Sequence, residues 1–113
     1  MQDNDRINMV FNYVKDSFRK PITLEHMADM TSMTVPSFCR YFKKMTRKTF
    51  VHFVNEYRVV HACKLLAENN ISIADVCYES GFNNFSHFNK SFKEVTGRSA
   101  SRYRYELRNV VTD

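Results

Sequence analysis

Two clusters of basic and amide side chains carry the residue types that DNA recognition requires. One contains Arg40 and the other contains Asn89, and each is followed by lysines within the next few positions. Arginine or lysine suits guanine O6 and N7, asparagine suits adenine N6 and N7, and flanking lysines suit phosphates. The two clusters therefore predict a major-groove reader with two contact points.

The net charge of +5 is concentrated in the same two parts of the chain. Residues 34–50 hold five Lys or Arg and no Asp or Glu, and residues 83–104 hold five against one. A single basic run is usually a solvated face, but one polyanionic partner explains two runs at equivalent places. The charge distribution therefore favours a nucleic acid as the partner.

Both clusters belong to a sequence repeat. The segment that begins at Ile22 returns at Ile71, an offset of 49 residues, and the offset is 50 residues from Phe42 to Phe92. The second copy therefore has one inserted residue just after its turn. Two copies of a small unit in 113 residues predict either two similar reading heads or one stacked array.

The elements that position the clusters are predicted to be helices. Apolar residues lie three to four apart, and only two Gly and two Pro interrupt the chain, so the fold class is all-α. We expect an initial helix over about 6–18, a long linker helix over about 50–68 and a final helix over about 100–107. Each repeat adds two helices around a tight turn, at 31–33 and at 80–82. The pattern predicts two helix-turn-helix units joined by the linker helix.

Four polar residues are predicted to begin the helices of the repeats. Thr23 and Ser72 are expected N-caps of the first helix in each pair, and Thr34 and Asn83 of the second. Their side chains can accept hydrogen bonds from the amides that the first helical turn leaves unpaired.

The second helix of each pair separates into an apolar and a polar face. In the first unit the apolar face is Phe38, Tyr41, Phe42 and Met45, and the polar face is Pro36, Ser37, Cys39, Arg40, Lys43 and Lys44. In the second unit the apolar face is Phe88, Phe92 and Val95, the polar face is Ser86, His87, Asn89, Lys90, Lys93 and Glu94, and Phe85 is at the border. The expected inner side of the linker helix is Phe53, Val54, Tyr57, His61 and Leu65. We expect the apolar faces in the core and the polar faces toward a partner.

Residues 71–104 carry several motifs at fixed spacing. They read ISIADVCYESGFNNFSHFNKSFKEVTGRSASRYR, similar to a pattern of I-x-x-I/V-A, G-F, S-x-F, F-K-x-x-x-G and Y-R. This pattern resembles the AraC/XylS family of bacterial transcription regulators, and the resemblance extends back to Thr23. It implies a seven-helix DNA-binding domain made of two homeodomain-like three-helix units. Ser32 and Arg47 stand where the family often has Gly, so we expect a modest strain in the first turn.

The boundaries that follow describe one DNA-binding domain over 1–113. We expect a first subdomain at about 5–48 with its helix-turn-helix at 23–45, the linker helix at about 50–68, and a second subdomain at about 71–108 with its helix-turn-helix at 72–95.

The helix faces and the resemblance together give the candidate DNA contacts. Base-facing residues are Pro36, Ser37, Cys39 and Arg40 in the first unit and Phe85, Ser86, His87, Asn89 and Lys90 in the second. Phosphate contacts are expected from Thr34, Lys43, Lys44, Asn83 and Lys93. Because the two faces differ, we expect a non-palindromic, two-part site read in successive major grooves. The second unit has the richer polar face and is expected to contribute at least as much to specificity.

Double-stranded DNA is therefore the predicted partner, with RNA polymerase as a further candidate, and no cofactor, metal or membrane is expected. Family members commonly carry an effector-binding or dimerising domain ahead of this one, and we expect that domain to be absent from the chain. Three cysteines without a CxxC pair, no signal-peptide core and no apolar run of roughly 20 residues indicate an intracellular protein. The resemblance places it in the bacterial cytoplasm, at the nucleoid.

The residues leave few alternatives to DNA binding. A basic interaction module that docks an acidic partner protein remains an alternative. An enzyme is disfavoured, because Ser86 and His87 point about 100° apart on a helix and cannot form a nucleophile–base pair by themselves. His61 and Cys63 also diverge, and no second ligand pair for zinc exists. Cys39, a thiol near positive charge, leaves a redox or alkylation sensor as a further alternative.

Overall fold

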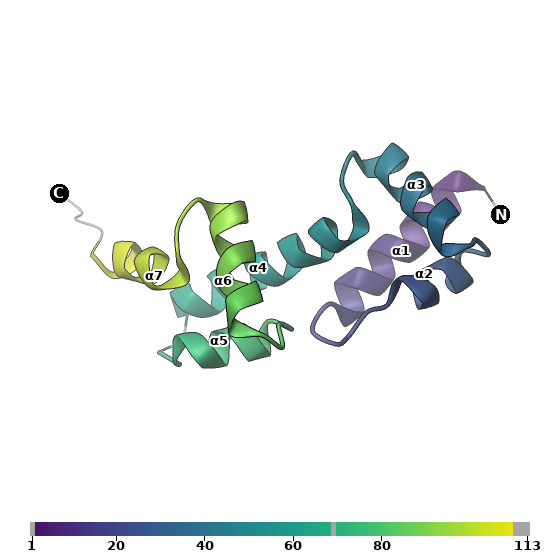
Figure 1. Cartoon of the computed structure of the whole chain (residues 1–113). Helices are drawn as coiled ribbons and strands as arrows, with labels where there is room; N and C mark the ends of the chain where they lie inside the picture. Colours follow the sequence, from purple (N-terminus) through teal and green to yellow (C-terminus); the bar gives the residue numbers. More distant parts are fainter. Residues whose placement is uncertain (1, 69, 110–113) are drawn as a thin grey trace. The chain divides into compact units, whose positions relative to one another are not determined.

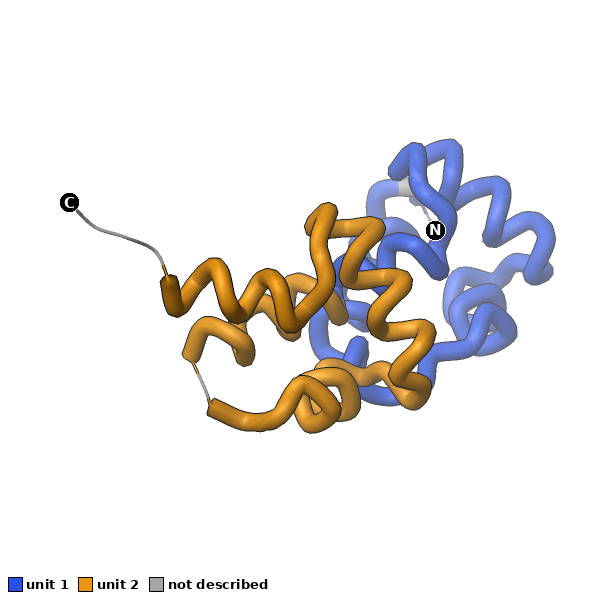
Figure 2. The backbone as a smooth tube through the Cα atoms, turned by 60° about the vertical axis from the view of Figure 1, so that its left-hand side comes forward, with its two compact units in different colours: residues 1–57 blue, residues 58–113 orange. Residues whose placement is uncertain are grey.

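The computed structural model describes residues 2–68 and 70–109, and these residues form seven α-helices and no strand (Figure 1). The helices are α1 (Asp3–Ser17), α2 (Leu24–Met30), α3 (Val35–Thr46), α4 (Phe50–Glu68), α5 (Ile73–Glu79), α6 (Phe85–Thr96) and α7 (Ala100–Arg108). The chain divides into two compact units, residues 1–57 and residues 58–113, with the division inside α4 (Figure 2). The predicted all-α class with two helix-turn-helix pairs is confirmed.

The observed helix boundaries agree closely with the predicted ones, and the largest difference is at the start of α1. α4 covers the predicted range, and α7 ends one residue later than expected. α1 begins at Asp3, three residues before its predicted start at Arg6. The first apolar position of its buried stripe is Ile7, so apolar spacing could not reveal the polar turn that precedes it.

Three of the four predicted N-caps are confirmed. The hydroxyl oxygens of Thr23 and Thr34 accept from the backbone N–H groups three residues later, at 3.1 Å and 3.3 Å. The hydroxyl of Ser72 does the same at 3.1 Å. These bonds satisfy amides that have no partner inside the helix, which fixes where α2, α3 and α5 begin.

The fourth predicted cap is wrong by one residue. Asn84, not Asn83, is the N-cap of α6, and its Oδ1 accepts from the backbone N–H of His87 at 2.9 Å. The residue inserted after the second turn is the reason. Once it is passed, the offset between the copies is 50, and Thr34 corresponds to Asn84.

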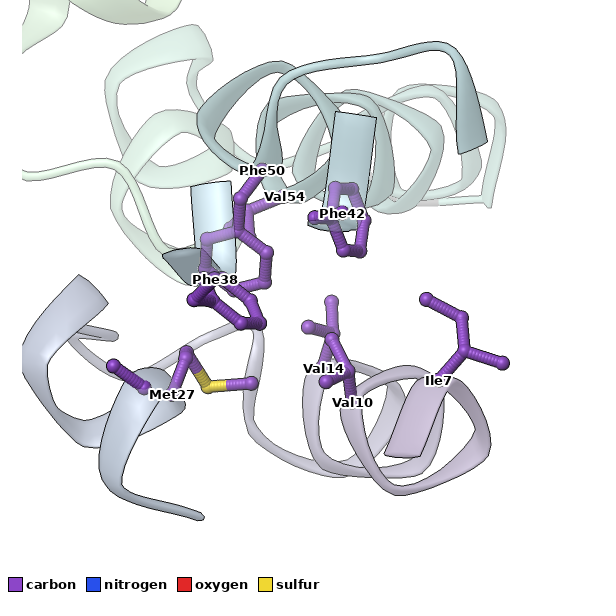
Figure 3. Close-up of a cluster of buried hydrophobic side chains, with 9 residues drawn as sticks. Ile7, Val10, Val14, Met27, Phe38, Phe42, Phe50 and Val54 are labelled. Carbon is purple, nitrogen blue, oxygen red and sulfur yellow. The ribbon is translucent and has the colours of Figure 1, made fainter. Parts of the chain in front are cut away.

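The core of the first unit is built around the aromatic side of α3. Phe38 and Phe42 are fully buried and lie, with Phe50 and Val54 of α4, opposite side chains of α1 and α2 (Figure 3). The phenyl ring centre of Phe42 is 5.3 Å from that of Phe50, with the planes perpendicular, an arrangement that favours aromatic pairs. Met45 was predicted on this side but remains 39% exposed, because it lies in the last turn of α3 beyond the packed part of the helix.

The second unit repeats this arrangement with α6 in the role of α3. Phe88 and Phe92 are fully buried with Val76 and Cys77 of α5 and Ala100 of α7. Ser91 is also buried, a position that the apolar pattern did not include. Each core therefore holds the back of a potential recognition helix.

The long helix α4 contributes to both cores, so its predicted inner side is confirmed only in part. Val54 is buried, and Phe53, Tyr57 and Leu65 are partly buried against one core or the other. The buried positions are Phe50 and Val54 in the first cluster and Val59, Ala62 and Leu66 in the second. The five-residue step between Val54 and Val59 interrupts the stripe, because each half of the helix serves a different unit.

Both copies keep the same left-handed backbone at their turns. Ser32 has φ +60° where its counterpart Gly81 has +98°, and Arg47 has +66° where Gly97 has +83°. A side chain in this region clashes with its own backbone, which glycine avoids. The strain predicted at Ser32 is therefore confirmed, and the fold keeps the turn despite it.

The buried hydroxyl groups at the ends of α2 and α5 differ in their hydrogen bonds. The Oγ1 of Thr31 donates to the carbonyl oxygens of Met27 and Ala28, at 2.9 Å and 3.1 Å. Ser80, its counterpart, is fully buried, and its Oγ has no hydrogen-bond partner within the described residues. A buried polar group without a partner loses its hydration and gains nothing in exchange.

We therefore expect Ser80→Ala to raise the free energy of unfolding by about 1 kcal/mol, as measured by urea denaturation. Thr31→Ala is the matched control and should lower it by about 1–2 kcal/mol, because it removes a satisfied hydroxyl and a buried methyl group. If Ser80→Ala lowered the stability instead, the serine hydroxyl would have to be hydrogen-bonded in solution.

Candidate nucleic-acid interface

The outward face of α3 gathers most of the first unit's candidate contacts. Pro36, Arg40, Lys43 and Lys44 are exposed. The Nη2 of Arg40 donates to the Oγ of Ser37 at 3.4 Å, a long hydrogen bond that would be released at little cost. The stretch from 34 to 50 contains no acid, so this face is positive along its length and suits a polyanion.

Three other first-unit candidates are less available. Ser37 and Cys39 are only half exposed, and the hydroxyl of Thr34 is occupied as the N-cap of α3. Cys39 borders an apolar hollow with Leu24 and Phe50, and the exposed Arg40 and Lys43 border the same hollow. Arg40 is therefore the first-unit residue best placed to reach a base edge.

The outward face of α6 carries a wider set of donors and acceptors. Ser86, Asn89, Lys90 and Lys93 are all exposed along the helix. Asn83 is exposed in the turn before the helix, where it is free of the capping role that Asn84 performs. This face combines an amide, a hydroxyl and two ammonium groups, which together can contact both bases and phosphates.

Two ring-bearing candidates on α6 are held by aromatic contacts. The imidazole of His87 packs against the ring of Phe82, with centres 5.3 Å apart. Phe85 packs against Phe88 at 5.9 Å, yet keeps 41% of its surface exposed. Both rings are therefore held in place while part of their surface remains open to a partner.

Not every basic residue in the second unit belongs to this face. Arg104 donates to the backbone oxygen of Ile71, and the guanidinium of Arg58 lies over the ring of Phe82, 5.9 Å from its centre. Burial lowers the pKa of both arginines below the usual range, although an arginine stays charged at neutral pH. These two arginines support the fold, and Lys90 and Lys93 carry the exposed positive charge of α6.

Sequence reasoning missed a second part of the repeat, just after each outward face. Glu56 pairs with Lys48 and His52, both at 2.9 Å. In the second unit Glu106 pairs with Arg98 at 2.5 Å and with Arg102 at 2.8 Å. Exposed ion pairs add little stability, but they order the loop after each helix.

The 50-residue offset of the repeat could have predicted these ion pairs. The offset of 50 residues continues past Thr46 and Thr96, whose hydroxyls each accept from a backbone N–H two residues later, at 3.2 Å and 3.3 Å. It reaches Glu56 and Glu106 without a further gap. The structural repeat therefore extends about ten residues beyond the one recognised from the apolar pattern.

The described part of the chain shows no metal cluster and no membrane-spanning helix. Residues 2–68 and 70–109 contain no group of three or more His, Cys, Asp or Glu side chains placed to hold a metal ion. Across the same residues, no helix is both long and apolar enough to cross a membrane. Cys39, Cys63 and Cys77 are unpaired, and burial raises the pKa of the Cys63 and Cys77 thiols.

Comparison with known sequences identifies the same part of the chain. A family model described as a helix-turn-helix domain matches residues 27–106. The bifunctional transcriptional activator/DNA repair enzyme AdaA of Bacillus subtilis is 31% identical over 104 residues, which cover 92% of this chain and 49% of AdaA. The chain spans about half or less of the length of the curated relatives that it matches.

Solved structures share the fold. A probable AraC family transcriptional regulator from Rhodopseudomonas palustris superposes with a TM-score of 0.82 at 20% identity, covering 91% of this chain and 97% of that one. The DNA-binding domain of the global transcriptional factor AdpA, solved with a target DNA, gives a TM-score of 0.79 at 23% identity, covering 92% and 95%. The arrangement of seven helices is therefore one that known proteins adopt.

Proposed function

The chain belongs to the AraC/XylS family of transcription regulators, and from this premise we propose that it binds double-stranded DNA sequence-specifically to regulate transcription. One observation carries the proposal. Two equivalent helices, α3 and α6, each bury a Phe pair and expose a positive, hydrogen-bonding face. The solved AdpA domain with its target DNA supports the same role for this fold.

We propose that the two faces divide their contacts by residue type. Base contacts are assigned to Pro36, Ser37, Cys39 and Arg40 in α3 and to Phe85, Ser86, His87, Asn89 and Lys90 in α6. Phosphate contacts are assigned to Thr34, Lys43, Lys44, Asn83 and Lys93. Arg40 and Asn89 have the strongest support, because each is exposed and has the geometry for bidentate contact with a purine.

The operator is proposed to have two unlike parts, one for each unit. Arg40 of α3 corresponds to Lys90 of α6, and Cys39 corresponds to Asn89, so the two helices would prefer different bases. We propose that each unit places its outward helix, α3 or α6, in the major groove, and that the two helices enter successive grooves of this operator.

The proposed role is that of a regulator without enzymatic activity. AdaA is bifunctional, but the chain matches only 49% of it, and the match is the helix-turn-helix part. We propose that the chain acts in the bacterial cytoplasm at the nucleoid, with RNA polymerase as a candidate partner.

A salt titration tests DNA binding through this face. Each phosphate contact contributes about −0.9 to the slope of log K against log salt concentration, so the three lysines assigned to phosphates predict a slope of about −2.7 or steeper. The measurement compares a duplex selected in vitro from random sequence with a scrambled duplex, by fluorescence anisotropy. Equal affinity for the two duplexes at moderate salt would contradict a specific regulator and favour a general basic module.

A further inference from the structure

The first turn of α6 exposes one large apolar side chain among polar ones. Phe85 is the first residue of the helix and keeps 41% of its surface exposed. Its neighbours Asn84, Ser86 and His87 are also exposed. Leaving a phenyl ring in water is unfavourable, so this position has an unfilled apolar contact in the free protein.

The orientation of this ring is set by packing. The ring of Phe85 contacts the fully buried ring of Phe88, with centres 5.9 Å apart and planes tilted by 43°. The backbone N–H of His87 donates to Oδ1 of the N-cap residue Asn84, and this hydrogen bond fixes the backbone around Phe85. Phe85 is therefore presented in a defined direction, and ordering it on binding would cost little entropy.

Asn89 lies one helical turn further along the same side. Residues four apart on a helix have Cβ atoms about 5–6 Å apart. The Asn89 side chain is exposed and makes no hydrogen bond within the described residues. An apolar ring and a free amide thus stand next to each other on the outward face.

The major groove offers one partner for each of these groups. Thymine is the base with an apolar C5-methyl group in the groove, and adenine pairs its N6 and N7 with an asparagine amide. Successive base pairs are about 3.4 Å apart, so side chains one helical turn apart reach the same pair or adjacent pairs. An A·T pair presents both features together.

We infer that Phe85 and Asn89 form a reader of A·T sequence, in which Phe85 contacts a thymine methyl group and Asn89 contacts an adenine. The reader is specific to the second unit, since the corresponding residues of α3 are Val35 and Cys39, both half-buried. The inference rests on the proposed function and adds the base chemistry that α6 recognises.

Uracil substitution tests the methyl contact without altering any Watson–Crick hydrogen bond. In a duplex selected in vitro, each thymine is replaced singly by uracil, and the affinity of the protein for each duplex is measured. We expect one or two positions in one half-site to weaken binding about 3- to 5-fold, the contribution of one buried methyl group. For Phe85→Ala, uracil and thymine should bind equally at those positions.

Two further variants separate the methyl contact from general damage. Phe85→Leu keeps an apolar side chain and should retain the preference for thymine over uracil. Asn89→Ala should instead remove the sensitivity to 7-deazaadenine, which lacks N7, at the same pair or an adjacent pair. Thermal melting followed by circular dichroism would show that each variant is folded.

The outcomes distinguish this inference from the proposed function. If no duplex is preferred over random DNA, the proposed function fails. If a duplex is preferred but no thymine responds to uracil, or the response persists in Phe85→Ala, the A·T reader is overturned while the regulator stands.

Discussion

Phe42→Ala should lower the free energy of unfolding of the first unit by about 3–5 kcal/mol, the largest change that we expect from one substitution. Phe42 is fully buried, and its ring centre lies 5.9 Å from Phe38, 5.3 Å from Phe50 and 5.2 Å from Phe53. Alanine would leave a cavity among rings that packing holds in place. Small domains are stable by only about 5–15 kcal/mol, so this loss should remove a large fraction of the stability of the unit.

Hydrogen exchange measured residue by residue would locate the effect. Amides of α1, α2 and α3 should lose protection, because all three helices supply the same core. Phe92→Ala is the matched substitution in the second unit and should expose α5, α6 and α7 instead. Met45→Ala is the control in α3, where partial exposure predicts a change below about 0.5 kcal/mol. A small effect of Phe42→Ala would mean that the rings can close the cavity.

The fold was predictable because its pattern is strong and repeated. Apolar spacing predicted all seven helices and located six of them to within a residue or two. The errors lie where the apolar spacing carries no information about the structure. The first turn of α1 is polar, and the stripe of α4 changes at Val54 because two cores share one helix.

The residue types of the candidate site could be proposed from the sequence, whereas the exposure of its individual side chains could not. The hollow that Cys39 borders cannot be seen in the sequence, whereas the capping role of Asn84 follows from the 50-residue offset once the inserted residue is placed before it. The pairs Lys48–Glu56 and Arg98–Glu106 join residues eight apart across a loop, where helical spacing does not apply. The hollow and the ion pairs across the loop depend on how residues from different elements pack together, which local sequence patterns do not determine.

Arg40→Ala should weaken binding to the selected duplex by about 1–3 kcal/mol and relax the preference at one or two base pairs. The guanidinium of Arg40 is exposed, and among the described residues its hydrogen bond is the long one to Ser37, so its removal should leave the fold intact. The planar fork of arginine matches guanine O6 and N7 better than the single ammonium group of lysine does. Binding to scrambled DNA should change much less, because that binding depends on phosphates.

Two further substitutions separate a base contact by Arg40 from a phosphate contact. Arg40→Lys keeps the charge but loses the fork, so affinity for scrambled DNA should persist while specificity falls. Lys43→Ala, one helical turn further along α3, should weaken all sequences alike and flatten the salt slope by about one. Anisotropy titrations of the three variants on both duplexes would distinguish the two roles. Equal losses on selected and scrambled DNA for Arg40→Ala would place its guanidinium on a phosphate, and specificity in the first half-site would then have to come from other residues of α3.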